Sequence, residues 1–403
     1  MTHPKLVEAM SRPGFYPHRP PSVQLVQTHI SFVFIAGDRV YKVKKAVDFG
    51  FLDFTTLDKR KHFCEEELRL NRRLAPDAYL EVAAIGEDAG GTPVLGGAQP
   101  VEYAVVMRRL PTDRMLKRLL AEGKAGTEAM DAIAAKVADF HRRAETGGRI
   151  DATGGIGTIR RNHDENFEQT ARYIGLTIPR ERYDFLRGWV NRFLERERPL
   201  FEKRVADHRI RDCHGDLHAE HICLADGIVI FDCIEFNERF RFGDVAAEAA
   251  FLAMDLDYNG YPDHARAFVE AYVRHSGDGE VRRLLDFYRC YYAYVRGKVT
   301  SFRLDDAHIG SADREAAART ASRYFDLAFA YAARPAGKTL ILVAGLMGTG
   351  KSVFARALAP LLGAPVVQTD AVRKEMLRIP ASEHRYEAFG EGIYSADISR
   401  RTY

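Results

Sequence analysis

The chain has 403 residues, 46% hydrophobic and 29% charged, and its 59 Lys and Arg nearly balance 56 Asp and Glu, for a net charge of +3. This is the composition of a globular protein, and the length predicts about two or three domains. Such balanced charge argues against a strongly basic nucleic-acid binder, so we expect no nucleic acid among its partners.

Neither a membrane span nor an export signal is predicted. The apolar run at residues 340–344 is far shorter than the roughly 20 residues that cross a bilayer. Prolines interrupt the N-terminal residues, where a signal peptide would need an apolar helix. The five cysteines are an odd number without a CxxC pair, so we expect reduced thiols. These features predict a cytoplasmic protein that makes no membrane contact.

Strands dominate the N-terminal part of the chain. The Pro- and Arg-rich residues 11–22 predict an extended lead-in. Apolar residues alternate along 30–34, a turn follows at 36–38, and 40–44 continue with period two. We therefore expect a hairpin, and three antiparallel strands by residue 45. A further strand is predicted at 102–107.

A helix is predicted between these strands, and helices dominate after them. Thr55 and Asp58 resemble a capping box, and the segment from there to Leu74 contains no Gly or Pro. Beyond residue 110, apolar periodicity predicts helices near 115–145, 165–205, 244–275 and 279–332. The expected fold class is α+β, with a small N-lobe at about 22–110 and a helical C-lobe at about 111–332.

Residues 213–221 hold three histidines and two carboxylates immediately before a predicted hairpin at 222–232. If Asp226 and Gly227 form a two-residue turn, the opposed pairs are Ala225 with Ile228, Cys223 with Ile230, and His221 with Asp232. Directly opposed residues have Cβ atoms about 5 Å apart. His221 and Asp232 would then hold one cation together, with Asp216 on the preceding loop.

The run from His214 to His218, followed sixteen residues after Asp216 by Asp232, resembles the catalytic and metal-binding segments of the aminoglycoside phosphotransferase and choline-kinase-like family. That family is protein-kinase-like, so the resemblance implies a bilobal fold over residues 1–335. It also implies that Asp216 is catalytic and positions or deprotonates a substrate hydroxyl. Asp232 would hold magnesium on the phosphates of ATP.

One position departs from the family pattern, because the Asn expected five residues after the catalytic Asp is His221. Magnesium prefers oxygen ligands, whereas an imidazole suits zinc, manganese, iron or nickel better. His221 either ligates the metal, with Mn2+ serving in place of Mg2+, or only makes a hydrogen bond. We interpret His214 and His218 as structural histidines that bond loop backbone groups.

The family also places a lysine on the nucleotide phosphates and a helix glutamate beside it. Lys42 shares a strand face with Val40, which would line an adenine pocket, whereas Lys44 has no such apolar neighbour. On the following helix, Glu67 falls inside an arc of apolar side chains, where a carboxylate needs a partner. We predict that Lys42 and Glu67 bind the nucleotide as a pair. The alternative is a solvated face for both lysines, with Glu67 beside the core.

A second phosphate-binding motif lies near the C-terminus. Residues 345–352 match G-x-x-x-x-G-K-[ST], between an apolar run at 339–344 and a predicted helix at 353–362. The backbone of such a loop cradles phosphates, its lysine contacts the β and γ groups, and its serine binds magnesium. The predicted nucleotide-binding residues are Gly345, Gly348, Gly350, Lys351 and Ser352, with Ser352 also a metal ligand. The alternative is a turn of similar composition.

These residues predict that 338–403 begin an α/β P-loop nucleotide-binding domain. Residues 365–370 predict a second strand ending at Asp370, which resembles small P-loop kinases and would make Asp370 a catalytic base. No later apolar strand ends in an acid, so the sheet of such a domain is incomplete. We therefore expect the chain to be a truncated piece of a longer protein.

The leading hypothesis is an ATP-dependent phosphotransferase that uses Mg2+ or Mn2+, moves the γ-phosphate to a hydroxyl of an unidentified acceptor, and carries a second ATP-binding module. The two motifs resemble bacterial proteins that fuse such modules. One alternative is a pseudokinase that binds nucleotide or a partner without chemistry, which the missing Asn favours. Another is a metal-dependent hydrolase whose ligands would be His214, Asp216, His218 and His221.

Overall fold

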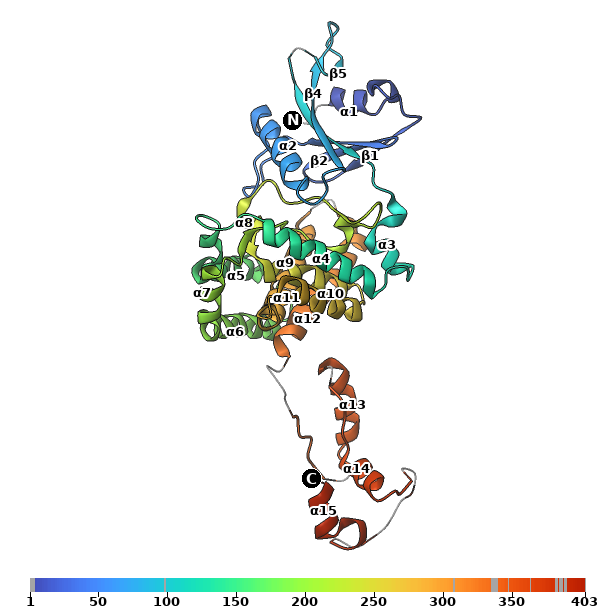
Figure 1. Cartoon of the computed structure of the whole chain (residues 1–403), viewed down its shortest axis with the longest axis vertical. Coiled ribbons are helices and arrows are strands. Elements are labelled where there is room, and N and C mark those ends of the chain that lie inside the picture. The colour runs from blue at the N-terminus through green and yellow to red at the C-terminus, as the bar shows by residue number, and fades with distance from the viewer. Residues whose placement is uncertain are drawn as a thin grey trace. The chain divides into compact units, whose positions relative to one another are not determined.

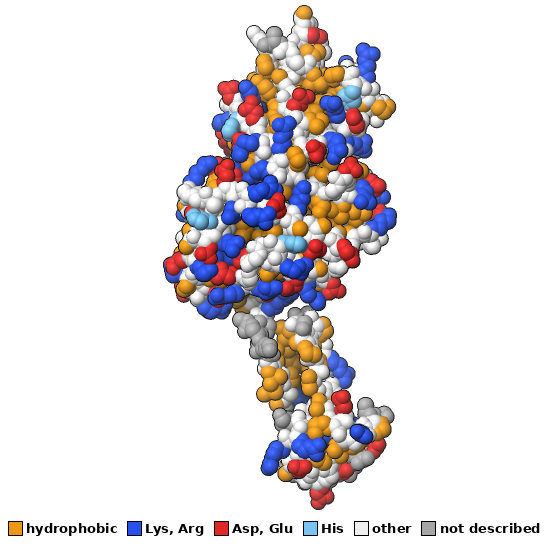
Figure 2. Space-filling model, in the orientation of Figure 1, with side chains coloured by type: hydrophobic (Ala, Val, Ile, Leu, Met, Phe, Trp, Pro, Cys, Tyr) orange, Lys and Arg blue, Asp and Glu red, His pale blue; other side chains and the backbone are white. Residues whose placement is uncertain are grey.

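The computed structural model describes residues 4–97, 99–306, 309–334, 340–346, 348–362, 364–380, 383, 387 and 390–402. The chain divides into two compact units, Met1–Ala332 and Ala333–Tyr403. Within the first unit, a strand-rich lobe adjoins a helical lobe (Figure 1). On the face in Figure 2, Lys and Arg are interspersed with Asp and Glu over this unit, in keeping with the small net charge.

A six-stranded antiparallel sheet forms the N-lobe, in the order β1-β2-β3-β6-β4-β5. Its strands are β1 (Val23–Gln27), β2 (Ser31–Ala36), β3 (Arg39–Lys44), β4 (Tyr79–Glu87), β5 (Pro93–Leu95) and β6 (Glu102–Arg108). Strands β2, β3 and β6 and the hairpin between β2 and β3 are confirmed where alternation predicted them. Strands β4 and β5 were not predicted, because β4 carries Ala83 and Ala84 at its centre and is held by pairing with β6 rather than by propensity.

Strand β3 divides its side chains between two environments, because successive residues point to opposite faces of a sheet. Tyr41 packs in the apolar core under helix α1 (Pro4–Met10), which covers one face of the sheet. Lys42 and Lys44 therefore point to the other face, where they meet helix α2 (Leu57–Asn71). This alternation places both lysines on the side of the sheet that faces the C-lobe.

Helix α2 begins one residue later than the capping pattern predicted. Thr56 is its N-cap, with Oγ1 accepting a hydrogen bond of 3.2 Å from Lys59 N. Thr55 instead donates its hydroxyl to Asp53 Oδ1 at 2.6 Å. The prediction of Thr55 as the cap was wrong because either residue of a Thr pair suits the position, and the contact with Asp53 decides between them.

The C-lobe is a helical core built around helix α9, in which every residue from 245 to 256 is buried. Its helices are α3 (Leu116–Ala121), α4 (Thr127–Arg143), α5 (Ile156–Thr170), α6 (Arg180–Arg196), α7 (Arg198–Ala206), α8 (Glu238–Arg241), α9 (Val245–Tyr258), α10 (Pro262–Ser276), α11 (Val281–Phe302) and α12 (Ser311–Ala333). The helical character of this lobe is confirmed, although each predicted stretch is divided into two or three helices. All five cysteines are buried free thiols. No helix among the described residues combines the length and apolarity needed to span a membrane.

The hairpin beside the predicted metal site has a different register from the predicted one. Its strands are β8 (Ile222–Cys223) and β9 (Val229–Ile230). Cys223 lies opposite Val229 instead of Ile230, so the predicted pairing was wrong by one residue. The loop between the strands covers 224–228, an odd number of residues, and a two-residue turn therefore does not form.

In the second unit, the described residues form helices and irregular segments without a strand. The helices are α13 (Lys351–Leu362), α14 (Thr369–Met376) and α15 (Ala396–Thr402). Leu340 and Leu342 are each 82% exposed, and residues 364–368 are irregular. The predicted strands at 339–344 and 365–370 are therefore wrong over their described residues, because an apolar segment needs a paired neighbour to become a buried strand. Thr339 lies outside the described residues.

Candidate active site

A cavity of about 1400 Å3 lies between the two lobes of the first unit. The N-lobe contributes Lys42 and Met107, and the C-lobe contributes Asp216 and Asp232. Strand β3, the loop before β8 and the segment after β9 therefore bring the residues predicted for the nucleotide and the metal to one place. A mostly apolar cavity with a few convergent charged groups is the usual form of a small-molecule site.

Lys42 is the centre of a charged cluster in this cavity. Its Nζ lies 2.9 Å from Glu67 Oε1 and 2.8 Å from Asp232 Oδ1. Lys44 Nζ donates to Glu67 Oε2 at 2.7 Å and also contacts Glu235. Glu67, which is fully buried, thus links the two lysines of strand β3. The structure brings together the predicted pair of Lys42 and Glu67, and it adds Lys44 and Glu235 to them.

The cluster keeps its charges although it is buried. Burial favours neutral Lys42, but the carboxylates of Asp232 and Glu67 raise its pKa well above the ordinary value. Burial likewise opposes ionisation of Glu67, yet the two lysines lower its pKa. For Glu235, burial outweighs the attraction of Lys44 and raises the pKa. Lys42 is therefore a fixed cation that points into the cavity.

Asp216 lines the same cavity as the charged cluster around Lys42. It lies on the loop that follows β7 (Ile210–Asp212). Its Oδ2 is 3.6 Å from His218 Nε2 and 3.6 Å from His221 Nδ1. Burial acts to raise the pKa of Asp216, but the two histidines lower it to about 2. Asp216 is thus ionised at neutral pH and can accept a hydrogen bond from a hydroxyl group.

The predicted contact between His221 and Asp232 forms despite the changed register. His221 Nε2 lies 3.5 Å from Asp232 Oδ2, although the residue that bonds the His221 carbonyl is Phe231. Asp232 has a φ of +62°, in the left-handed region that non-glycine residues seldom adopt. This backbone turn swings the carboxylate toward His221, and strained backbone of this kind concentrates at functional sites.

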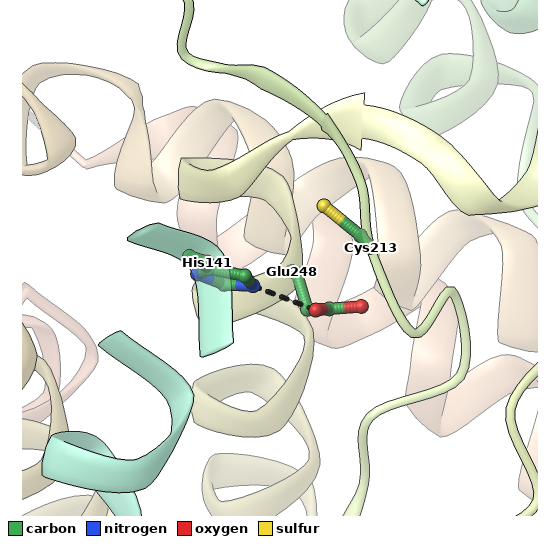
Figure 3. Close-up of side chains that lie close together, drawn as sticks. All are labelled: His141, Cys213 and Glu248. Atoms are coloured by element: carbon green, nitrogen blue, oxygen red, sulfur yellow. Dashed lines mark hydrogen bonds and ion pairs between the residues drawn. The ribbon is translucent and has the colours of Figure 1, made fainter. Parts of the chain in front are cut away.

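The loop that carries Asp216 is anchored from helix α9. Glu248 Oε1 accepts hydrogen bonds of 2.7 Å from both His214 N and Gly215 N. Glu248 Oε2 in turn lies 2.7 Å from His141 Nε2 on helix α4. Figure 3 shows His141 and Glu248 pointing toward one another, with Cys213 on the adjacent loop. Because Glu248 already bonds His141 and the two loop amides, it acts as a structural anchor for this loop.

The two remaining histidines of the motif differ in role. His214 Nε2 bonds Phe231 O at 3.0 Å, and Asp216 N approaches His214 Nδ1 at 3.3 Å, as expected for a structural histidine. His218 instead places its ring against the Asp216 carboxylate. Gly215 has a φ of +86°, and a Cβ there would meet Phe240 O at 2.8 Å, so the loop requires glycine at this point.

His221 and Asp232 are placed to hold a divalent cation between them, and Asp216, His218 and His221 form a second group whose ligand atoms lie within 4.8 Å of one another. His221 Nδ1 lies 3.0 Å from Asp216 O, and a hydrogen bond there assigns the ring proton to Nδ1. His221 Nε2 then turns a lone pair toward the Asp232 carboxylate, an arrangement that a cation, a proton or a bridging water satisfies. Ligand atoms about 2.0–2.2 Å from an ion lie roughly 3–3.5 Å apart, which matches the observed separation. The donor set of oxygen and nitrogen atoms suits Mn2+ as well as Mg2+.

The second predicted motif forms a local turn in the second unit. Gly348 and Gly350 adopt φ values of +78° and +80°, and helix α13 starts directly at Lys351. Lys351 Nζ donates to Leu346 O at 2.5 Å, so its side chain folds back over the loop. Gly345 and Ser352 flank this turn. Asp370 lies in the first turn of α14, 3.2 Å from Lys374, instead of at the end of a strand as predicted.

Sequence reasoning missed several residues that shape the first site. The signal for Lys44 was present, because a strand places residues 42 and 44 on one face. Glu235 and Glu248 carry no local signal, since each meets its partner only through the fold. The same holds for Tyr79, whose hydroxyl accepts a hydrogen bond from Asp232 N at 3.1 Å.

An antiparallel sheet over a helical lobe, with this charged cavity between them, fits a protein-kinase-like fold. Comparison with known families agrees: residues 38–293 match the phosphotransferase enzyme family. The chain therefore belongs to that family. Family membership supports a phosphotransferase and does not name its acceptor.

Among curated proteins, the chain is 35% identical over 376 residues to uncharacterized proteins of Mycobacterium tuberculosis and Mycobacterium bovis. The match covers 93% of this chain and 72% of each relative. Among solved structures, it is similar to a choline/ethanolamine kinase family protein from Mesorhizobium loti (13% identity, TM-score 0.46, 81% of this chain and 99% of that one). It is also similar to a microcompartment-associated aminopropanol kinase (12% identity, TM-score 0.49, 81% and 97%).

Proposed function

We propose that the first unit transfers the γ-phosphoryl group of ATP to a hydroxyl group of a small acceptor. Lys42, held by Glu67, contacts the nucleotide phosphates. Asp216 accepts the hydrogen bond of the acceptor hydroxyl and orients its oxygen for attack. Catalysis of phosphoryl transfer needs little covalent chemistry from the protein, so positioning and charge account for most of the effect.

Asp232, with His221, would hold a magnesium or manganese ion. Such an ion would neutralise negative charge on the transferred phosphoryl group. The observation that carries the proposal is the position of Lys42 Nζ, within 3 Å of both Glu67 and Asp232. Because one cation meets a carboxylate from each lobe, the phosphates of a nucleotide would bind where the two lobes meet.

The test is calorimetric titration of a non-hydrolysable ATP analogue with Mg2+ or Mn2+, made in a Lys351→Ala background that removes the second motif. Asp232→Asn should abolish binding, whereas Asp216→Asn should keep binding and lower ATP turnover by about 100-fold or more. Asp226→Asn is the matched control, because this exposed acid lies in the loop of the hairpin that precedes Asp232, and Asn tolerates its positive φ. Unchanged binding in Asp232→Asn would refute the proposal.

ATP turnover and metal content, measured beside this titration, separate the two rival functions. A pseudokinase would bind the analogue and show no metal-dependent ATP turnover that depends on Asp216. A metal-dependent hydrolase would contain tightly bound zinc after purification and would not require Lys42. The contact of Lys42 with Asp232 favours the phosphotransferase over the hydrolase, because a metal-dependent hydrolase needs no lysine beside its metal ligand.

We also propose that the second unit binds a nucleotide through residues 345–352. The turn formed by Gly348 and Gly350 directly before helix α13 supports this, since helix N-termini preceded by such turns bind phosphate. Lys351 and Ser352 would contact the phosphates and the metal, and Gly345 admits close approach of the backbone. Asp370 would serve as a base toward a second acceptor. Loss of one binding site per chain in Lys351→Ala would support this assignment, and unchanged stoichiometry would refute it.

A further inference from the structure

Helices α5 and α11 line the same cavity as Asp216, and we assign this part of it to the acceptor of the proposed reaction. Helix α11 lines it with a face of residues spaced three or four apart, of which Tyr288, Tyr292 and Arg296 are members. Lys298 also lines the cavity from the same helix. Charged groups on this face therefore decide what kind of acceptor reaches Asp216.

Lys298 is a cavity cation whose two hydrogen-bond partners are neutral. Its Nζ donates to Asn166 Oδ1 at 2.7 Å and to Gln169 Oε1 at 2.8 Å, both on helix α5. Among the described residues, no carboxylate lies within ion-pair distance of this amine. An ammonium group has three donors, so one remains after these two hydrogen bonds. Burial lowers the pKa of Lys298 to about 8, which still leaves most of the amine charged at neutral pH.

Arg296 is a second cavity cation for which the described residues supply no ion pair. Its guanidinium lies over the ring of Tyr324, 5.8 Å from the ring centroid. A planar guanidinium presents five donors in a fixed fork, which suits carboxylate and phosphate groups. Arg296 and Lys298 thus bring two positive charges to the acceptor side.

The acids of the same cavity are already occupied. Glu165 pairs with Arg239 at 2.6 Å, Glu235 contacts Lys44, and Asp244 pairs with Arg204 at 2.6 Å. Glu248 bonds His141 and two backbone amides. Among the described lining residues, only Asp216 and Asp232 remain, and both belong to the phosphoryl-transfer site. Among these described lining residues no other carboxylate is left to receive an ammonium group of a substrate, and neither Lys298 nor Arg296 forms an ion pair with a described carboxylate.

We propose that the acceptor carries an anionic group, a carboxylate or a phosphate, next to its reactive hydroxyl, and that Lys298 and Arg296 bind this group. The inference rests on the proposed function, because it concerns the second substrate of the same site. An acceptor with an ammonium group would be repelled by these side chains, since like charges in a partly buried site disfavour binding.

The test uses four probes that share a hydroxyl pattern and differ in charge: gluconate, glucose 6-phosphate, glucose and glucosamine. Each is added to the full chain before brief acetylation, and the modification of Lys298 is measured by mass spectrometry. Gluconate or glucose 6-phosphate should slow the reaction about tenfold at ten times its Kd, because labelling follows the free fraction. The stronger of the two identifies the anion as carboxylate or phosphate. Lys136, half-buried on helix α4 and outside the cavity lining, is the internal control and should not respond.

Protection of Lys298 should be lost in Arg296→Gln. In Lys298→Arg, which retains the charge, calorimetry should still detect binding of gluconate or glucose 6-phosphate. Protection by glucosamine, or failure of both anions, would overturn the inference. Binding of the ATP analogue is measured on the same wild-type samples. If that binding fails while anions protect Lys298, the proposed phosphotransfer fails and the anion site stands. If nucleotide binds while anions do not protect, only the anion site is refuted.

Discussion

Lys42 Nζ and Asp232 Oδ1 lie 2.8 Å apart although 190 residues separate them in the chain. The first belongs to a strand of the N-lobe, and the second follows a hairpin of the C-lobe. This contact ties the two lobes together at the point where a nucleotide would bind.

Replacement of Lys42 by Met should lower ATP turnover by about 100-fold or more, because a fixed cation in a site that excludes water stabilises developing charge strongly. The fold should survive, since Lys44 still pairs with Glu67. Steady-state ATP hydrolysis measures the effect. Lys45→Met is the control, because Lys45 bonds a backbone carbonyl away from the cluster. Equal turnover in both variants would contradict the role of Lys42.

Replacement of Lys44 by Met should reduce the free energy of unfolding by about 3–5 kcal/mol, because Glu67 and Glu235 lose a buried partner and repel each other. Lys44 is 2% exposed, so water does not replace the lost contact. Urea unfolding followed by circular dichroism measures the change. Lys44→Met should be more destabilising than Lys42→Met, whose side chain is 14% exposed. The reverse order would show that the cluster does not depend on Lys44.

Replacement of Glu248 by Ala should lower both the melting temperature and ATP turnover. The change leaves the amides of His214 and Gly215 without an acceptor, at a cost of about 1–3 kcal/mol for each buried group. Glu248→Gln keeps one acceptor oxygen and should be milder in both respects. Differential scanning calorimetry and turnover are measured on the same samples. Full activity in Glu248→Ala would refute an anchoring role for this residue.

The titration of Lys298 should make a contribution to the stability of the protein that rises with pH. Its pKa is lowered by burial to about 8 in the folded state, against about 10.4 in the unfolded chain. Between these values the unfolded state binds more protons, so the free energy of unfolding increases as pH rises. Lys298→Met should remove this increase. Urea midpoints at about pH 7.5 and 10 test it, and an unchanged slope in the variant would contradict the lowered pKa.

Replacement of His221 by Asn should shift metal preference from Mn2+ toward Mg2+. The imidazole Nε2 facing Asp232 is a nitrogen donor, whereas the amide of Asn offers an oxygen that Mg2+ prefers. ATP turnover titrated with each metal gives the ratio, which should change by about tenfold or more. The same ratio in wild type and variant would mean that His221 does not contact the metal. His62→Asn, on the surface of helix α2, is the control.

Much of the first site follows from the sequence, because its parts depend on local patterns. Period-two alternation in 40–44 put Lys42 on the cleft side of its strand, and helical periodicity placed Glu67 among buried neighbours. The close spacing of Asp216, His218 and His221 likewise guaranteed their proximity. The expected strand-rich and helical lobes agree with the structure for the same reason, since each element carries its own periodic signal.

Tertiary structure alone decided the contacts between segments far apart in the chain. The partners of Lys44 and Glu248 lie on other elements, so no local pattern in the sequence predicts these contacts. Asp232 reaches His221 through a left-handed backbone turn that corrects a register predicted one residue off. The strands predicted near residues 340 and 365 do not form, because a strand needs a paired neighbour. The apolar run by itself does not indicate whether that neighbour is present.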